Sequence, residues 1–170
     1  MGRAIAHCLA SRPDTTTVVI GDVNTEKASS IAGQIMKNFS VGCGSIKFDA
    51  NDPDSLKNAP GFDVIISALP ARYNLSLAEA AIRQGMHFCD LGGVLPITLG
   101  MKGGLDVMAQ KSGVSVVPDC GLMPGLGVMI ARELVYKSLQ DEPDLKAFRA
   151  VTIYVGGRPQ KPVGPIHYQK

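Results

Sequence analysis

The sequence predicts an α/β fold built on a doubly wound parallel β-sheet. Short, nearly continuous apolar runs alternate with segments in which apolar residues recur every three to four positions. Such runs are typical of strands buried on both faces, and their alternation with helices indicates βαβ units. The chain also has 170 residues, 45% of them hydrophobic, which suits one ordinary domain.

Five strands are expected, over residues 17–22, 45–50, 62–69, 87–91 and 114–118. The first ends in Gly-Asp, and the third is the strongest apolar run, stopped by Pro70. From Phe148 onward the pattern changes, because apolar residues alternate with polar ones at Val151, Ile153 and Val155. This alternation predicts a further strand that is exposed on one face.

Six helices are expected, over residues 5–9, 25–39, 53–59, 74–84, 98–111 and 126–139. Thr25 is the candidate N-cap of the second helix, and Pro53 stands in the first turn of the third. Gly85 follows the fourth as a C-terminal cap. The adjacent Gly103 and Gly104 weaken the fifth.

Composition and cysteine spacing exclude several classes of protein. The 17 Lys and Arg against 15 Asp and Glu give a net charge of +2 without a basic block, which argues against a nucleic-acid partner. No apolar run reaches the roughly 18 residues of a membrane span, and the first apolar stretch is too short and too interrupted for a secretory signal, so we expect neither. The four cysteines lack metal-ligand spacing, so we expect no metal site. We therefore expect a cytoplasmic protein whose reduced thiols are small buried side chains. Cys120 is the one exception, as an alternative nucleophile for which the sequence identifies no base.

Gly2 and Asp22 indicate a dinucleotide site. In G-x-G-x-x-G loops the third glycine opens a helix, and an acidic residue about 20 positions later binds the adenine ribose. Gly2 stands directly before the first helix, and Asp22 ends the first predicted strand. The following Val23 and Asn24 bring no Arg or Lys for a 2′-phosphate, so NAD is expected ahead of NADP. Alternatively, Asp22 only begins a turn.

The strand that normally precedes such a loop is not found ahead of Gly2. In the strand order 3-2-1-4-5-6 that strand is central to the sheet. We therefore expect the strands over 17–22 and 62–69 each to have an unpaired inner edge. Because exposed edges invite association, the isolated 170-residue chain is expected to be unstable or prone to aggregate.

Three motifs occur in order: DVIISALP at 63–70, GMHFCDLGG at 85–93 and PDCGLMPG at 118–125. With these the sequence resembles the saccharopine dehydrogenase-like family. The third motif and the tail YVGGRPQ at 154–160 favour its lysine 6-dehydrogenase branch. The resemblance implies a Rossmann-like dinucleotide-binding domain over 1–146. Residues 147–170 would begin an α+β substrate and dimerisation domain.

The same resemblance implies an oxidoreductase that acts on a CH–NH group of a small amino-acid substrate. NAD is the expected hydride acceptor, with NADP possible, and the complete protein is expected to be a homodimer. In the lysine 6-dehydrogenase branch the ε-amine of L-lysine becomes an imine, which hydrolyses to the semialdehyde. Saccharopine or a polyamine precursor is an alternative substrate. A non-catalytic nucleotide-binding module is the alternative outside enzymes.

Carried over by position, the resemblance gives a set of residues that contact the cofactor. Gly2 would approach the pyrophosphate and Asp49 the adenine. Asn74 either bonds the nicotinamide or merely begins its helix. The complete set is Gly2, Asp22, Val23, Asp49, Ala68, Leu69, Pro70, Asn74 and Asp90. Residues 68–70 follow a strand at its carboxyl end, where open α/β sheets bind ligands.

Asp119 is the candidate catalytic residue. It lies between the end of the last predicted strand and Gly121. An ammonium has no lone pair, so an amine must lose a proton before its carbon can lose a hydride. A carboxylate at this position could orient the substrate amine or act as the base. Alternatively, Asp119 only caps the turn.

Overall fold

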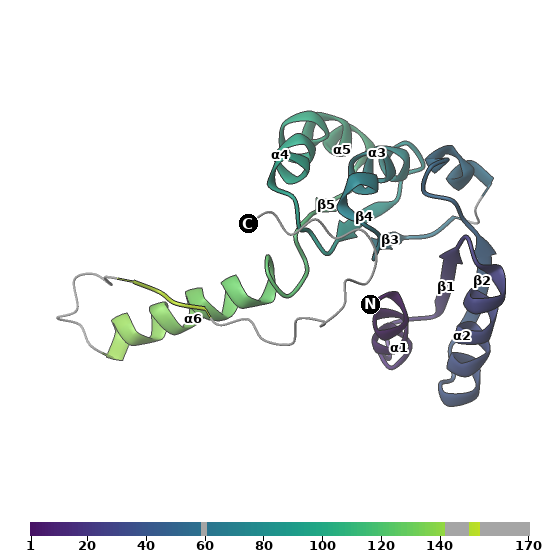
Figure 1. The fold of residues 1–170 in the computed structure, drawn as a ribbon, viewed down its shortest axis with the longest axis horizontal. Helices are drawn as coiled ribbons and strands as arrows, with labels where there is room; N and C mark the ends of the chain where they lie inside the picture. The colour runs from purple at the N-terminus through teal and green to yellow at the C-terminus, as the bar shows by residue number, and fades with distance from the viewer. Residues whose placement is uncertain (59–60, 142–149, 154–170) are drawn as a thin grey trace, which may run out of the picture.

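A computed structural model describes residues 1–58, 61–141 and 150–153. Within them strands alternate with helices, and every strand pair is parallel, which confirms the α/β class (Figure 1). The described strands form two sheets, β1–β2 and β3–β4–β5. None of the helices in these residues has the length and apolar character needed to cross a membrane.

The first sheet pairs β1 (Thr17–Asp22) with β2 (Gly42–Lys47) along their whole lengths. β2 was expected over 45–50, so the predicted strand is shifted by three residues. Glycine is a poor strand former, so the sequence pattern does not predict a strand over GCG at 42–44. The complete edge of β1 provides hydrogen-bond partners from Thr17 to Asp22, and this pairing outweighs the local preference.

Two helices, α1 (Gly2–Ala10) and α2 (Thr25–Asn38), pack on this pair of strands. Their shared core holds Ala6, Ala10, Val18 and Ile35. The N-cap of α2 is Asn24 and not Thr25, because Asn24 Oδ1 accepts a hydrogen bond from the backbone N–H of Lys27 at 2.8 Å. Thr25 already belongs to the first turn.

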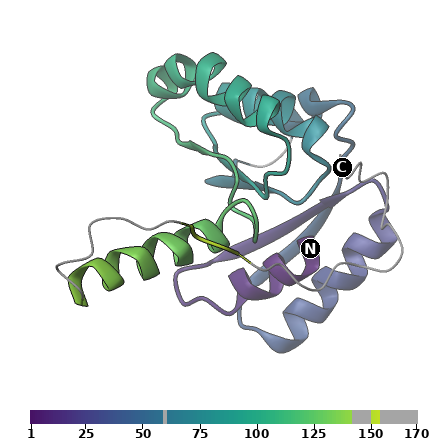
Figure 2. The same ribbon diagram turned by 60° about the vertical axis from the view of Figure 1, so that its left-hand side comes forward.

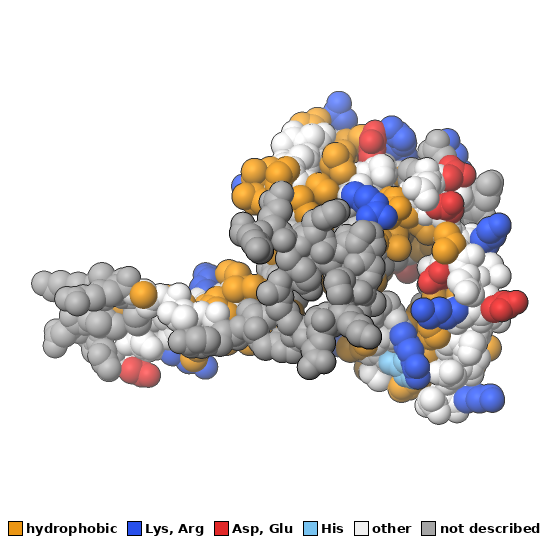
Figure 3. Space-filling model, viewed as in Figure 1, with side chains coloured by type: hydrophobic (Ala, Val, Ile, Leu, Met, Phe, Trp, Pro, Cys, Tyr) orange, Lys and Arg blue, Asp and Glu red, His pale blue; other side chains and the backbone are white. Residues whose placement is uncertain are grey.

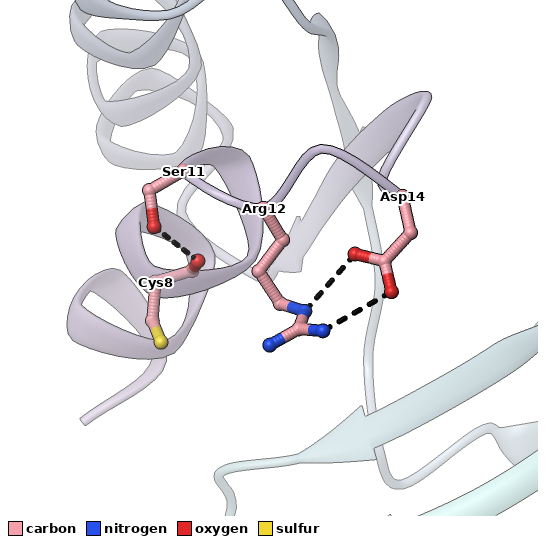
Figure 4. A network of polar contacts seen from close by, with 4 residues as sticks. All are labelled: Cys8, Ser11, Arg12 and Asp14. Carbon is pink, nitrogen blue, oxygen red and sulfur yellow. Dashed lines mark hydrogen bonds and ion pairs between the residues drawn. The ribbon is translucent and has the colours of Figure 1, made fainter.

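The turn from α1 into β1 is held by polar contacts that Figure 4 shows. Ser11 Oγ donates to the carbonyl of Cys8 at 2.7 Å at the end of the helix. Arg12 donates from Nε and Nη2 to the two carboxylate oxygens of Asp14, at 3.0 and 3.1 Å. Both side chains of this ion pair are exposed, so the pair contributes little to the stability of the fold.

The second sheet orders its strands β3 (Val64–Ser67), β4 (His87–Asp90) and β5 (Val116–Val117). Each is shorter than predicted. Its core includes Phe88 and side chains from the helices that pack against the sheet. These helices are α3 (Asn74–Arg83), α4 (Leu95–Gly104) and α5 (Asp106–Ser112), and the 3-10 turns η1 (Pro53–Asn58) and η2 (Ala71–Tyr73) lie in the connections.

The single helix predicted over 98–111 is wrong, because α4 and α5 meet at Leu105. Gly103 and Gly104 disfavour further helix, so α4 ends there. Leu105 is only 7% exposed, and its burial fixes the junction between the two helices. The apolar periodicity did not indicate this break, because the same apolar stripe continues from the first helix into the second.

The last described helix, α6 (Leu126–Asp141), extends away from both sheets and buries no residue (Figures 1 and 2). Large hydrophobic side chains are exposed along it, including Met129 and Leu134, and also on α4 (Figure 3). The predicted domain boundary and the start of a second domain over 147–170 lie almost entirely outside the described residues. The described part of that segment, 150–153, is not paired into a strand.

Within the described residues, one edge of β1 and one edge of β3 have no neighbouring strand. Among the described residues β1 pairs only with β2, and β3 pairs only with β4. The N–H and C=O groups along these two edges have no strand partner there. The effect on the stability of the isolated chain stays a prediction.

Candidate functional site

Predicted site residues lie at the carboxyl ends of the parallel strands in both sheets. Asp22 ends β1, and Asp90 ends β4. Asp49 follows β2, Ala68 follows β3, and Asp119 follows β5. Ligands of open α/β sheets bind at this edge. The predicted site residues are therefore located where a ligand is expected, although they belong to two sheets that are not hydrogen-bonded to each other.

The strand ends of β1 and β2 bring Asp22 and Asp49 together. The backbone N–H of Phe48 donates to the Asp22 carbonyl at 3.1 Å. Asp22 Oδ1 accepts from the N–H of Asn24 at 2.9 Å, so the turn predicted as the alternative does form. Asp49 is exposed, and its Oδ1 accepts from both the backbone and the side-chain amide of Asn51. Val23 is 61% exposed beside them.

Gly2 lies against the end of β3. A Cβ built on Gly2 would be 3.6 Å from the Cβ of Ala68, which is an ordinary contact. Packing within the described protein therefore does not require a glycine here, whereas close approach of a ligand would. The N-terminus of α1 has no side-chain cap, so its first N–H groups suit a phosphate. Leu69 and Pro70 are exposed at the same strand end.

Asn74 and Ser67 form a buried polar pair that links β3 to α3. Ser67 Oγ donates to Asn74 Oδ1 at 2.7 Å, and the two residues are 2% and 1% exposed. The amide oxygen of Asn74 is therefore engaged inside the protein. It fixes how α3 begins after β3, and its contact with a nicotinamide stays a prediction.

Asp90 joins the end of β4 to the segment that follows β5. It is 2% exposed, and its Oδ1 accepts from the N–H groups of Gly92 and Asp119 at 2.6 and 3.0 Å. Its backbone carbonyl accepts from the N–H of Cys120 at 2.8 Å. These contacts make Asp90 the anchor of the loop that carries Asp119. A direct contact of Asp90 with the cofactor stays a prediction.

Asp119 has the least satisfied side chain of the site. Its φ of 63° is in the left-handed region that side-chain-bearing residues rarely adopt. Its Oδ1 is buried and has no hydrogen-bond partner. A Cβ at Gly92 would collide with this oxygen, so glycine is required there for the carboxylate to fit. A buried, unpartnered acceptor at this edge suits a ligand that brings N–H donors.

Sequence reasoning missed Ser67 and the two glycines that let the loops interlock. A Cβ at Gly121 would collide with the carbonyl of Leu91, so the 91–93 and 119–125 segments pack backbone against backbone. The glycines in the motifs at 85–93 and 118–125 were the sequence signal that could have indicated this close packing. Among the described residues, no group of three His, Cys, Asp or Glu side chains could hold a metal ion.

The cysteines differ from the expected small buried side chains. Cys8 and Cys120 are exposed, and Cys43 and Cys89 are half-buried. Burial raises the pKa of the Cys89 thiol to about 11, and Cys120 and Asp90 add to the effect. Burial also raises the pKa of Cys120, together with the negative charges of Asp90 and Asp119. The thiols of this site are therefore protonated near neutral pH.

Comparison with known proteins gives several relatives. Saccharopine dehydrogenase (NADP(+), L-glutamate-forming) of Schizosaccharomyces pombe is 28% identical over 116 residues, which are 68% of this chain and 24% of that protein. The Pyricularia oryzae protein of the same name is 27% identical over 73% of this chain and 27% of its own length. The alpha-aminoadipic semialdehyde synthase of Arabidopsis thaliana is 28% identical over 68% of this chain and 10% of that protein. The chain thus spans about a quarter of the first two relatives.

Two solved structures share the fold. The apo saccharopine dehydrogenase (L-Glu forming) of Saccharomyces cerevisiae aligns over 82% of this chain and 29% of its own, with a TM-score of 0.66 and 21% identity. A myo-inositol dehydrogenase of Corynebacterium glutamicum aligns over 81% of this chain and 38% of its own, with a TM-score of 0.56 and 19% identity. At these identities the likeness shows the fold alone, and it is the Rossmann-type fold expected.

A family model described as the saccharopine dehydrogenase NADP binding domain matches residues 1–112. That range holds every predicted cofactor residue, from Gly2 to Asp90. The description of the family supports binding of a nicotinamide dinucleotide, NAD or NADP, and the expected preference for NAD stays a prediction. Because the match covers well over half of its length, the chain belongs to the saccharopine dehydrogenase NADP-binding domain family.

Proposed function

We propose that the complete protein is an NAD(P)-dependent oxidoreductase that removes a hydride from the amine-bearing carbon of an amino acid, with L-lysine as the first candidate substrate. The observation that carries the proposal is the buried, unpartnered Oδ1 of Asp119 at the carboxyl edge of the sheet. A substrate ammonium supplies both the positive charge and the N–H donors that this oxygen lacks.

The residues at the strand ends fit a nicotinamide dinucleotide. The uncapped N-terminus of α1, with Gly2 against Ala68, would hold the pyrophosphate. Asp22 would accept hydrogen bonds from the adenosine ribose, and the exposed Leu69 and Pro70 would line the cofactor after β3. The bound cofactor supplies the hydride acceptor.

The chain's own part in the chemistry is to hold the amine and to receive its proton. Asp119 Oδ1 binds the ammonium and takes up the proton that the nitrogen must lose before hydride loss. Asp90 fixes the loop through the N–H of Asp119, so the carboxylate keeps its place while its charge changes. With L-lysine, the product imine would hydrolyse to the semialdehyde and ammonia.

NAD is proposed as the preferred cofactor. Asp22 would bond the ribose hydroxyls of NAD, but it would repel the 2′-phosphate of NADP. Asn24 is engaged as the N-cap of α2, and neither Val23 nor Asn24 carries a positive charge. The relatives and the family are named for NADP, so the two cofactors must be compared directly.

The test assays the complete protein for NADH and NADPH production with L-lysine, saccharopine and a diamine. NADH production with L-lysine is the expected result. Saccharopine is the second candidate because two relatives carry that name, and activity with it alone would move the proposal to that substrate. If none of the three substrates is oxidised while the protein still binds the cofactor, a non-catalytic nucleotide-binding module replaces the enzyme.

A further inference from the structure

Two cysteines, Cys89 and Cys120, lie on either side of Val117 near the loop that carries Asp119. In β4 Cys89 is paired in register with Val117 of β5. The chain then turns, and Cys120 Sγ lies 3.4 Å from the carbonyl oxygen of Val117. The Cys120 thiol is thereby directed back toward the strand position beside Cys89. The Cys120 backbone is fixed there as well, because its N–H donates to the carbonyl of Asp90 at 2.8 Å.

The two thiols are near enough to affect each other's ionisation. Burial raises the pKa of both, and Cys120 adds to the rise at Cys89, whereas Cys89 partly offsets the rise at Cys120. A disulfide between them requires the two sulfur atoms to approach to about 2.05 Å. Cys120 is exposed and can meet a small oxidant, whereas Cys89 is half-buried and can act as the second thiol.

We propose that Cys89 and Cys120 form a reversible disulfide that ties β4 to the Asp119 loop when the protein meets a peroxide. The Cys120 thiolate attacks one peroxide oxygen and becomes a sulfenic acid, releasing the first water after proton uptake. Cys89 then attacks that sulfur and expels the second water. In balance, two thiols and one hydrogen peroxide give one disulfide and two waters. The thiols lose two electrons, and the peroxide gains them.

Oxidation should be slow at neutral pH and faster in alkali. Only the thiolate attacks, and burial keeps both thiols protonated, with a pKa of about 11 for Cys89. The charged groups that act on the pair are the carboxylates of Asp90 and Asp119, and they also raise the pKa of Cys120. Below these pKa values the rate is expected to rise about tenfold per pH unit, in step with the thiolate fraction.

The experiment treats the complete protein with hydrogen peroxide, alkylates the remaining thiols, and identifies the digested peptides by mass spectrometry. The expected product is a Cys89 to Cys120 linked pair, two hydrogens lighter than the reduced peptides and separated by dithiothreitol. Cys120→Ser should abolish the link and leave Cys89 alkylated. Cys43→Ser, a matched change at another half-buried cysteine, should retain it.

A link from Cys120 to Cys8 or Cys43 would overturn the inference, as would oxidation of Cys120 to a sulfinic acid while Cys89 stays reduced. The effect of the disulfide on catalysis rests on the proposed function, since it would restrict the Asp119 loop. We expect activity to fall at least tenfold on oxidation and to return with dithiothreitol. If the Cys89 and Cys120 peptides are linked in a protein that has no dehydrogenase activity, the proposed function is refuted and the disulfide is still supported.

Discussion

Two carboxylates at the sheet edge differ in what they bond, and the difference separates their roles. Asp22 shares one oxygen with the N–H of Asn24 and stays half-buried at the end of β1. Asp119 has a buried oxygen without a partner. An acceptor already satisfied by the backbone can hold a neutral ribose, whereas an unsatisfied buried acceptor gains most from a cationic donor. Each residue can be tested by a change of charge at nearly constant shape.

Asp119→Asn is expected to lower kcat/KM for the amine substrate about 100-fold, because the amide cannot accept the substrate proton. Binding of the nicotinamide dinucleotide should change less than about twofold, since Asp119 is assigned to the substrate. Steady-state kinetics and cofactor titration measure the two effects. Asp14→Asn, an exposed carboxylate paired with Arg12, is the control and should retain activity. Full activity of the Asp119 variant would show that Asp119 only caps the turn and takes no part in the reaction.

Asp22→Asn is expected to weaken NAD binding by about tenfold or more, because a hydrogen bond to a charged group contributes about 1.5–3 kcal/mol. NADP should lose less, or gain, since the repulsion of its 2′-phosphate is removed. Isothermal titration calorimetry with both cofactors gives the comparison, again with Asp14→Asn as the reference. An unchanged affinity for NAD would remove Asp22 from the ribose site.

At the scale of elements, the connection from β3 to α3 depends on one buried hydrogen bond. Ser67→Ala removes the donor to Asn74 Oδ1 and leaves that oxygen buried without a partner. We expect the free energy of unfolding to fall by about 1–3 kcal/mol in urea denaturation. Ser76→Ala is the matched control, because Ser76 Oγ donates to the carbonyl of Tyr73 at an exposed position. Equal losses for both variants would show that burial does not matter there.

Elements with a strong local signal were predictable, and those decided by a partner were not. Asn74–Arg83 follows its apolar stripe and ends before Gly85, whose φ is 70°. β2 forms over glycines because β1 supplies its hydrogen bonds. The sequence predicted where the loop of Asp119 lies along the chain, but not its conformation. That conformation depends on a hydrogen bond to Asp90, 29 residues earlier. A contact at that separation leaves no periodic trace in the sequence.

At the scale of the whole molecule, the two unpaired strand edges set the behaviour of the 170-residue chain. The inner edges of β1 and β3 have no strand partner within the described residues. We expect the chain alone to associate as its concentration rises, because such edges template pairing with other chains. Sedimentation velocity over a concentration series measures this. A monomer with a single cooperative thermal transition at all concentrations would contradict the expectation.

The α/β class, the alternation of strands with helices and the carboxylates at the strand ends could all be predicted from the amino-acid sequence. These features follow from local periodicity and from residues that end a strand, and both can be recognised within a short stretch of the sequence. Which of those carboxylates are hydrogen-bonded and buried became known from the three-dimensional packing. Asp90 is buried beneath the loop of Asp119, the Asp119 oxygen is left without a partner, and Cys120 lies beside Val117, the register partner of Cys89. Burial and hydrogen-bond satisfaction depend on segments distant along the chain, and packing alone brings those segments together.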